Sequence, residues 1–103
     1  MKREFFIAGV QHHNSSAVID ELEELMDLEL TPEPDNQYDA NAVRIEYKMD
    51  AGPNCMLGYV PAKFSAEVGA ALEIHDNVVC SIVYLAKAAK PWERIKVLIQ
   101  GGE

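Results

Sequence analysis

The stretch that decides the fold is MDLELTPEPDNQYDANAVRIEY, residues 26–47. Apolar and polar residues alternate over 26–32 and again over 42–47, which is the pattern of half-buried β-strands. Pro32 ends the first stretch and Pro34 follows it, and neither proline can donate to a strand ladder. A run of Asp and Asn residues that favour turns comes next. The stretch therefore predicts two strands joined by a turn-rich loop. The second strand is expected to place Val43, Ile45 and Tyr47 inward and Arg44 and Glu46 outward.

The segments on either side repeat the β pattern. Strands are predicted over about residues 3–11, 56–60, 78–85 and 92–99 from their β-branched and aromatic content. Gly58 lies in the middle of one of these strands, where a glycine usually marks a bulge or the close approach of another backbone.

One helix is predicted from the spacing of its apolar residues. It begins near Pro61, ends before Asp76-Asn77, and carries one apolar stripe made of Phe64, Val68, Ala71 and Leu72. Residues 17–25 fit either two helical turns, with Ser16 as the N-cap and Val18, Leu22 and Leu25 as the apolar face, or an irregular loop with one turn. The predicted fold class is mainly β with a minor α part, a small six-stranded barrel of the OB or SH3 type with one or two short helices.

Length and composition are those of an ordinary folded domain. The chain has 103 residues, of which 49% are hydrophobic and 25% charged, so we expect a single domain over residues 1–103. No apolar window is long enough to cross a bilayer, and the apolar stretch near the N-terminus is too short for a secretory signal. Two cysteines, Cys55 and Cys80, sit among apolar neighbours, so we expect reduced thiols and a cytoplasmic protein without a membrane partner.

The charge is negative and unevenly distributed. A net charge of -8 opposes phosphate binding by bulk electrostatics. Nine acids and no Lys or Arg fall between residues 20 and 39, whereas residues 87–96 carry four bases against the single acid Glu93. The sequence therefore predicts an acidic body with one local basic edge.

The patterns of common enzymes are missing from the sequence. There is no glycine-rich phosphate loop, no Gly-x-Ser-x-Gly, no Cys-x-x-Cys and no His-Glu-x-x-His. His12 and His13 are adjacent, and adjacent residues of a strand point to opposite faces, so they are not expected to share a metal. We expect no catalysis, no metal and no cofactor.

Three motifs resemble the HIRAN domain family. They are Ile7-Ala8-Gly9-Val10, the loop EPDNQYDANAV over residues 33–43, and Leu57-Gly58-Tyr59-Val60-Pro61 before a helix. Order and spacing agree with the family pattern over nearly the whole chain. The resemblance implies an OB-like barrel and, by similarity to the HIRAN domains of fork-remodelling helicases, binding of single-stranded DNA at its 3′ end.

The resemblance also implies roles for individual residues. Tyr38 would stack on a terminal base, Asp39 would accept a hydrogen bond from the 3′-hydroxyl, and Asn36 would be a polar contact nearby. DNA-binding members carry an Arg and an aromatic residue where this chain has Gln11 and His12, and more basic residues after the later strand, where it has only Lys63. His12 can still stack, whereas Gln11 cannot pair with a phosphate as Arg does.

Two aromatic residues outside the loop complete the candidates, Tyr59 and Trp92. Trp92, between Lys90 and Arg94, has the setting of a second stacking platform. The alternatives are structural: a Tyr59 that belongs to the core or rim, a Trp92 at the start of a strand, and a loop from Asp35 to Asn41 that only forms Asx turns.

The sequence thus favours a nucleic-acid-binding module that recognises single-stranded DNA 3′ ends and is not itself an enzyme. The alternative is a protein-interaction adaptor whose acidic face serves a helicase, nuclease or other DNA-processing partner. If the Tyr38 ring were sealed in the core and the Asp39 carboxylate bound only its own main chain, the fold assignment alone would remain.

Overall fold

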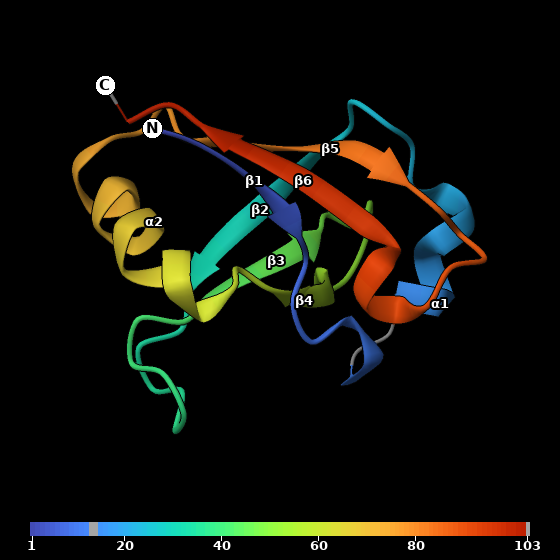
Figure 1. Ribbon diagram of the computed structural model, residues 1–103, viewed down its shortest axis with the longest axis horizontal. Helices are drawn as coiled ribbons and strands as arrows, with labels where there is room; N and C mark the ends of the chain where they lie inside the picture. Colours follow the sequence, from blue (N-terminus) through green and yellow to red (C-terminus); the bar gives the residue numbers. More distant parts are fainter. Residues whose placement is uncertain (13–14, 103) are drawn as a thin grey trace.

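The fold is a strongly curled antiparallel sheet with one helix packed against it (Figure 1). The computed structural model describes residues 1–12 and 15–102, and within these the sheet has six strands in the order β1-β6-β5-β2-β3-β4. The strands are β1 Lys2–Phe6, β2 Asp27–Pro32, β3 Val43–Tyr47, β4 Cys55–Tyr59, β5 Val79–Leu85 and β6 Ile95–Gln100. The helical elements are η1 Val10–His12, α1 Ser15–Val18, η2 Ile19–Glu21, α2 Ala62–Ile74 and η3 Pro91–Glu93. The predicted fold class, a small mainly β OB-like protein, is confirmed in the form of a half-barrel.

The alternating stretch that decides the fold forms β2 and β3 as predicted. Val43 and Ile45 are completely buried, and the inward residues of the other strands join them in one core. Glu46 was expected to be exposed, and that expectation is wrong, because its side chain is only 6% exposed. Thr31 Oγ1 donates to it at 2.7 Å and Arg44 Nη2 lies 3.0 Å from its other oxygen, so the outer face of β3 is covered by polar neighbours.

Two predicted strands are shorter than the sequence pattern suggests. β1 ends at Phe6 rather than near residue 11, because Gly9 turns the chain with φ +72° into η1. β6 begins at Ile95 rather than at Trp92, because Pro91 starts the short helix η3, and a proline suits the first helical position.

The segment before β2 follows the irregular alternative. Val18 and Leu22 are buried as expected, but Leu25 is 83% exposed and has φ 73°, so of the two alternatives for residues 17–25 the one with two helical turns is wrong. α1 already begins at Ser15, so Ser16 lies inside it and is not its N-cap. The backbone N–H of Leu25 donates to Ile82 of β5 at 2.7 Å, and this pairing pulls the chain out of helical geometry.

The two ends of the curled sheet meet at a single bridge between Ala8 and Tyr59. The two residues exchange backbone hydrogen bonds of 2.9 and 2.8 Å, next to Gly58. A Cβ on Gly58 would collide with the Ala8 carbonyl oxygen, which confirms the predicted close approach of another backbone. The β3–β4 register shifts beside Gly58, which confirms the predicted bulge. Helix α2 covers the remaining gap, where Phe64 stacks on Phe5 with ring centroids 5.5 Å apart.

The cysteines are free thiols, Cys80 buried and Cys55 partly so. Among the described residues, no helix is long and apolar enough to span a membrane. Burial, and to a lesser degree the charge of Asp27, raise the pKa of the Cys80 thiol from 9.0 to about 12. In the unfolded chain this thiol ionises near its ordinary pKa, so its contribution to stability is complete below pH 9 and is lost as the pH rises toward 12.

We therefore expect wild-type stability to fall more steeply above pH 9 than that of a Cys80→Ala variant. The difference in slope should be about 1.4 kcal/mol per pH unit. Urea unfolding under reducing conditions at pH 8 and pH 10.5 measures it. The variant starts less stable because of the cavity, and only the difference between the two slopes is diagnostic; equal slopes would contradict the burial of this thiol.

Candidate nucleic-acid interface

Asn36 organises the loop between β2 and β3. Its Oδ1 accepts the backbone N–H groups of Tyr38 at 2.8 Å and Asp39 at 3.0 Å, which is an Asx turn. Its own backbone N–H donates to the Glu33 carbonyl at 3.1 Å. Held in this way, the loop projects the Tyr38 side chain into solvent, with 94% of the residue exposed. Asn36 is therefore engaged in building the loop, and the Tyr38 ring is free of the core.

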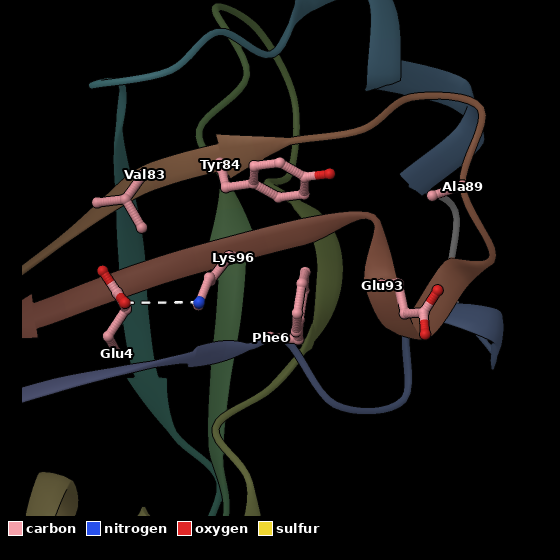
Figure 2. A pocket seen from close by; sticks show the side chains of 7 residues that line it. All are labelled: Glu4, Phe6, Val83, Tyr84, Ala89, Glu93 and Lys96. Carbon is pink, nitrogen blue, oxygen red and sulfur yellow. Dashed lines mark ion pairs between the residues drawn. The ribbon is translucent and has the colours of Figure 1, made fainter.

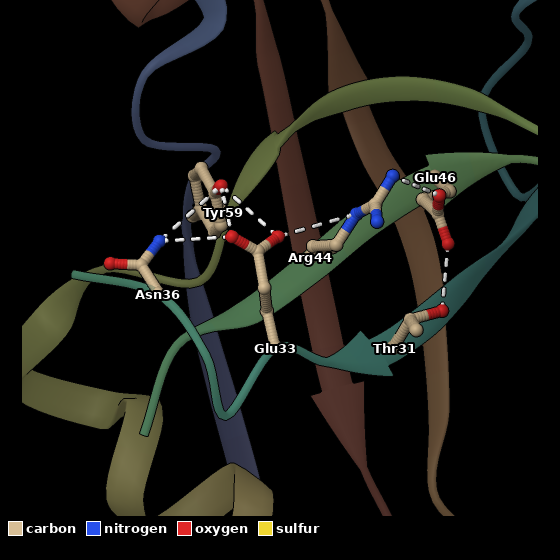
Figure 3. Close-up of polar contacts among 6 residues, drawn as sticks. All are labelled: Thr31, Glu33, Asn36, Arg44, Glu46 and Tyr59. Carbon is tan, nitrogen blue, oxygen red and sulfur yellow. Dashed lines mark hydrogen bonds and ion pairs between the residues drawn. The ribbon is translucent and has the colours of Figure 1, made fainter. Parts of the chain in front are cut away.

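A polar network fixes the base of this loop (Figure 3). The Tyr59 hydroxyl donates to the Glu33 carboxylate, with distances of 3.0 and 3.2 Å to its two oxygens, and Asn36 Nδ2 donates to the same carboxylate at 3.1 Å. Arg44, which pairs with Tyr59 across the β3–β4 ladder, places its Nε 3.5 Å from Glu33 Oε2 and its Nη2 3.0 Å from Glu46. The network ties three strands and the loop together on the outer face of the sheet.

The network also keeps the Tyr59 phenol protonated. Burial, the hydrogen bond to Glu33 and the Glu33 charge raise the pKa of Tyr59, and Asn36 and Arg44 lower it by less. A neutral phenol can go on donating to the carboxylate. Tyr59 thus serves as a rim residue that supports the loop.

The Asp39 carboxylate is oriented from two directions. Its Oδ1 accepts the backbone N–H of Asn41 at 2.8 Å, and its Oδ2 accepts the hydroxyl of Ser65 in α2 at 2.8 Å. Ser65 is only 2% exposed, so this contact anchors the loop to the buried side of the helix. A carboxylate offers about four acceptor sites, and these contacts use two. One of the two hydrogen bonds comes from the backbone of the same loop, and about two acceptor positions of the Asp39 carboxylate remain.

Tyr38, Asp39, Asn36 and Tyr59 line one hollow of about 260 Å³. The rest of its lining is small and apolar, from Ala8, Ala42, Val60 and Ala62. Tyr38 and Asn36 also line a second hollow of about 470 Å³, which contains Arg44, Glu33 and Asp35. The first hollow combines apolar walls, aromatic rings and one fixed carboxylate, which suits a ligand with a flat ring and a hydroxyl group on a neighbouring group.

The other sequence candidates lie elsewhere. Gln11 and His12 are exposed in η1, which packs against η3, the element that carries Trp92. Trp92 lies in η3 and is 51% exposed, with Lys90 Nζ 5.7 Å from its ring centroid. Lys63 is exposed in the first turn of α2, where its Nζ lies 5.1 Å from the Phe64 ring. None of these four is among the residues that line the first hollow.

The described part of the chain holds no cluster of three His, Cys, Asp or Glu residues that could bind a metal. His13, the second member of the histidine pair considered from the sequence, lies outside the described residues.

Sequence reasoning missed Ser65, Glu33 and Arg44 as parts of the site. Ser65 had a detectable signal, because it is a polar residue beside the apolar stripe of α2 and so needs a buried partner. Arg44 and Glu46 occupy the same face of β3 with opposite charges, which signals an ion pair. The partnership of Glu33 with Tyr59 joins residues 26 positions apart and has no local signal.

Comparison with known proteins places the chain in a family. A model of the HIRAN domain matches residues 2–101. The chain belongs to the HIRAN domain family. The crystal structure of the HIRAN domain of human HLTF superimposes with a TM-score of 0.70 at 11% identity, covering 95% of this chain and 72% of that one. A protein from Lactobacillus plantarum gives 0.75 at 15% identity, covering 96% and 95%. No curated protein sequence matches the chain significantly.

Membership of the HIRAN family indicates the class of function. HIRAN is a binding domain rather than a catalytic one, and the family is generally associated with nucleic-acid binding. In this HIRAN domain, the 260 Å³ hollow beside the loop is the place where an exposed aromatic ring and a fixed carboxylate meet.

Proposed function

We propose that this HIRAN domain binds the 3′ end of single-stranded DNA in the hollow lined by Tyr38, Asp39 and Tyr59. The observation that carries the proposal is the pairing of a fully exposed Tyr38 ring with an anchored Asp39 carboxylate on the rim of one apolar hollow. The terminal base stacks on Tyr38, and the 3′-hydroxyl donates to Asp39.

The charge of Asp39 gives the proposed site its selectivity. A carboxylate accepts a hydrogen bond from a free hydroxyl, but it repels the phosphate that follows every internal nucleotide. Selection for an end thus requires no positive cluster in the hollow itself. The acidic body, with a net charge of -8, lowers affinity for every strand alike.

The decisive experiment compares two otherwise identical short single strands, one ending in a 3′-hydroxyl and one in a 3′-phosphate. Fluorescence anisotropy at low salt should show binding of the first and much weaker binding of the second. Equal binding of both strands, with a steep salt slope, would indicate a general basic edge and contradict end recognition.

Replacement of Tyr38 by Ala should weaken binding of the 3′-hydroxyl strand by about 5- to 150-fold, which corresponds to one stacked base. Tyr38→Phe keeps the ring and should retain nearly full affinity. Because the side chain is 94% exposed, neither change should lower the melting temperature. If Tyr38→Ala and wild type bound the 3′-hydroxyl strand with equal affinity, the terminal base would not stack on this ring.

The second candidate function is a protein-interaction adaptor. It is favoured by the exposure of seven acids in or before the loop: Asp20, Glu21, Glu23, Glu24, Asp27, Glu29 and Asp35. Such a surface is complementary to a basic partner protein. The adaptor would be the better explanation if no single strand bound even at low salt.

A further inference from the structure

A second aromatic surface lies on the outer face of β1, β6 and β5 (Figure 2). In the strand register, Lys96 of β6 is paired with Phe6 of β1 on one side and with Tyr84 of β5 on the other. Directly paired residues share a face of the sheet, so these three side chains form one row. Tyr84 is 47% exposed.

This row forms part of an open hollow of about 460 Å³, whose lining also includes Val83 and Ala89. The Phe6 and Tyr84 rings meet edge to face, with centroids 6.1 Å apart. Lys96 Nζ lies 5.5 Å from the Phe6 centroid and 3.5 Å from Glu4 Oε2. Exposed ion pairs of this kind contribute little, so Lys96 can exchange Glu4 for another anion.

The segment that runs past this hollow carries the basic edge of an otherwise acidic chain. Lys96 lines the hollow itself together with two acids, Glu4 and Glu93, and Lys87 and Lys90 are exposed in the connection that also contributes Ala89 to the lining. These lysines are cations that a phosphate backbone passing over the hollow can contact. Cations among aromatic rings are the composition of single-strand binding surfaces.

The chain that leaves β1 contributes to both this hollow and the proposed end site. Phe5 and Ile7 are buried in the core, so Phe6 and Ala8 alternate to the outside. Phe6 lines the outer hollow and Ala8 lines the one that contains Tyr38 and Asp39. Two residues of extended chain span only about 7 Å, so one short strand can contact both residues.

We propose that the row Phe6–Lys96–Tyr84 is a second subsite for single-stranded nucleic acid, which holds the nucleotides on the 5′ side of the terminal one. This inference rests on the proposed function, since the end site sets where the strand begins. A base stacks on the exposed Tyr84 ring, and Lys96 contacts a phosphate. The subsite supplies cations that the end site lacks.

The test measures the affinity of a 3′-hydroxyl mononucleotide and of a 3′-hydroxyl strand of eight nucleotides for wild type, Tyr84→Ala and Lys96→Gln. Wild type should bind the octamer more tightly than the mononucleotide, which reaches the end site alone. Tyr84→Ala should weaken octamer binding at least about fivefold, and Lys96→Gln should reduce its salt slope by about 0.7, the value for one phosphate contact. Neither variant should change mononucleotide binding or the preference for a 3′-hydroxyl. Lys48→Gln, an exposed lysine beyond β3, is the matched charge control.

The outcomes separate the two proposals. Equal affinity for both lengths, or an octamer advantage that Tyr84→Ala and Lys96→Gln leave unchanged, would overturn the second subsite and leave the end site intact. An octamer advantage that depends on Tyr84 and Lys96 without any preference for the 3′-hydroxyl would support the subsite and overturn end recognition. Failure to bind any strand would overturn both.

Discussion

Asp39→Asn is expected to abolish the preference of this HIRAN domain for a 3′-hydroxyl over a 3′-phosphate. The substitution removes the negative charge that repels the phosphate and weakens the hydrogen bond from the hydroxyl. Hydrogen bonds to charged groups contribute about 1.5–3 kcal/mol, so the ratio of the two dissociation constants should fall by about 10- to 100-fold. Part of the change should come from tighter binding of the phosphate strand.

The structure explains why this variant should fold normally. The Asn oxygen can still accept the Asn41 N–H, which lies 2.8 Å from the present carboxylate oxygen. Its amide can donate to Ser65, whose hydroxyl can then turn to the Ala62 carbonyl, 3.0 Å away. Anisotropy titrations with both strands, together with a melting curve, measure the effect on selectivity apart from stability.

Asp35→Asn is the matched control, because Asp35 is an exposed acid on the same loop and the change in net charge is identical. Asp35→Asn should slightly tighten the binding of both strands and leave the ratio of their dissociation constants unchanged. If Asp35→Asn lowered this ratio as much as Asp39→Asn does, the selectivity would come from the net charge of the loop and not from one oriented carboxylate.

Ser65→Ala tests the positioning of that carboxylate. Removing the hydroxyl 2.8 Å from Asp39 Oδ2 leaves Asp39 charged but free to rotate about its remaining contact. The preference for the hydroxyl should weaken by less than in Asp39→Asn. Ser65→Thr, which restores a hydroxyl, should recover part of this preference.

The fold was largely predictable because alternation along a strand is a local property. Val43 and Ile45 show it plainly, since each alternate residue meets either the core or the outer face. The prediction was wrong for Glu46 because its burial depends on side chains that other strands bring over it. It was also wrong for Leu25, whose conformation follows from a hydrogen bond to Ile82, 57 positions further along the chain.

The candidate site was predictable only in part, for the same reason. The motif places Tyr38 and Asp39 in a turn, and the structure confirms an exposed ring there. Which partners orient Asp39 depends on how α2 docks on the loop, which nothing local to residues 33–43 records. Gln11 and His12 were grouped with the loop by resemblance, whereas Gly9 directs them into η1, and neither is among the residues that line the hollow.

Gly58→Ala is expected to cause the largest loss of stability of the substitutions considered. The added Cβ would collide with the Ala8 carbonyl oxygen and lie 2.6 Å from Ile7 Cγ2. Neither residue can move away without a loss of stability, because the backbone N–H and C=O of Ala8 are both hydrogen-bonded to Tyr59 and Ile7 is only 1% exposed. Overpacking of this kind costs about 3 kcal/mol, measured as the change in the free energy of unfolding in urea.

Gly52→Ala is the comparison that separates this clash from the general cost of replacing a glycine. Gly52 has φ +82° and no atom within 4 Å of an added Cβ, so its replacement costs only the backbone strain of about 1 kcal/mol. Gly58→Ala should also impair binding of single strands, since the displaced residues Ala8 and Tyr59 line the proposed end site, whereas Gly52→Ala should not. If both substitutions lowered the free energy of unfolding equally, the Ala8–Tyr59 bridge would have to shift at little energetic cost. The hollow that it shapes would then be too flexible to select one end of a strand.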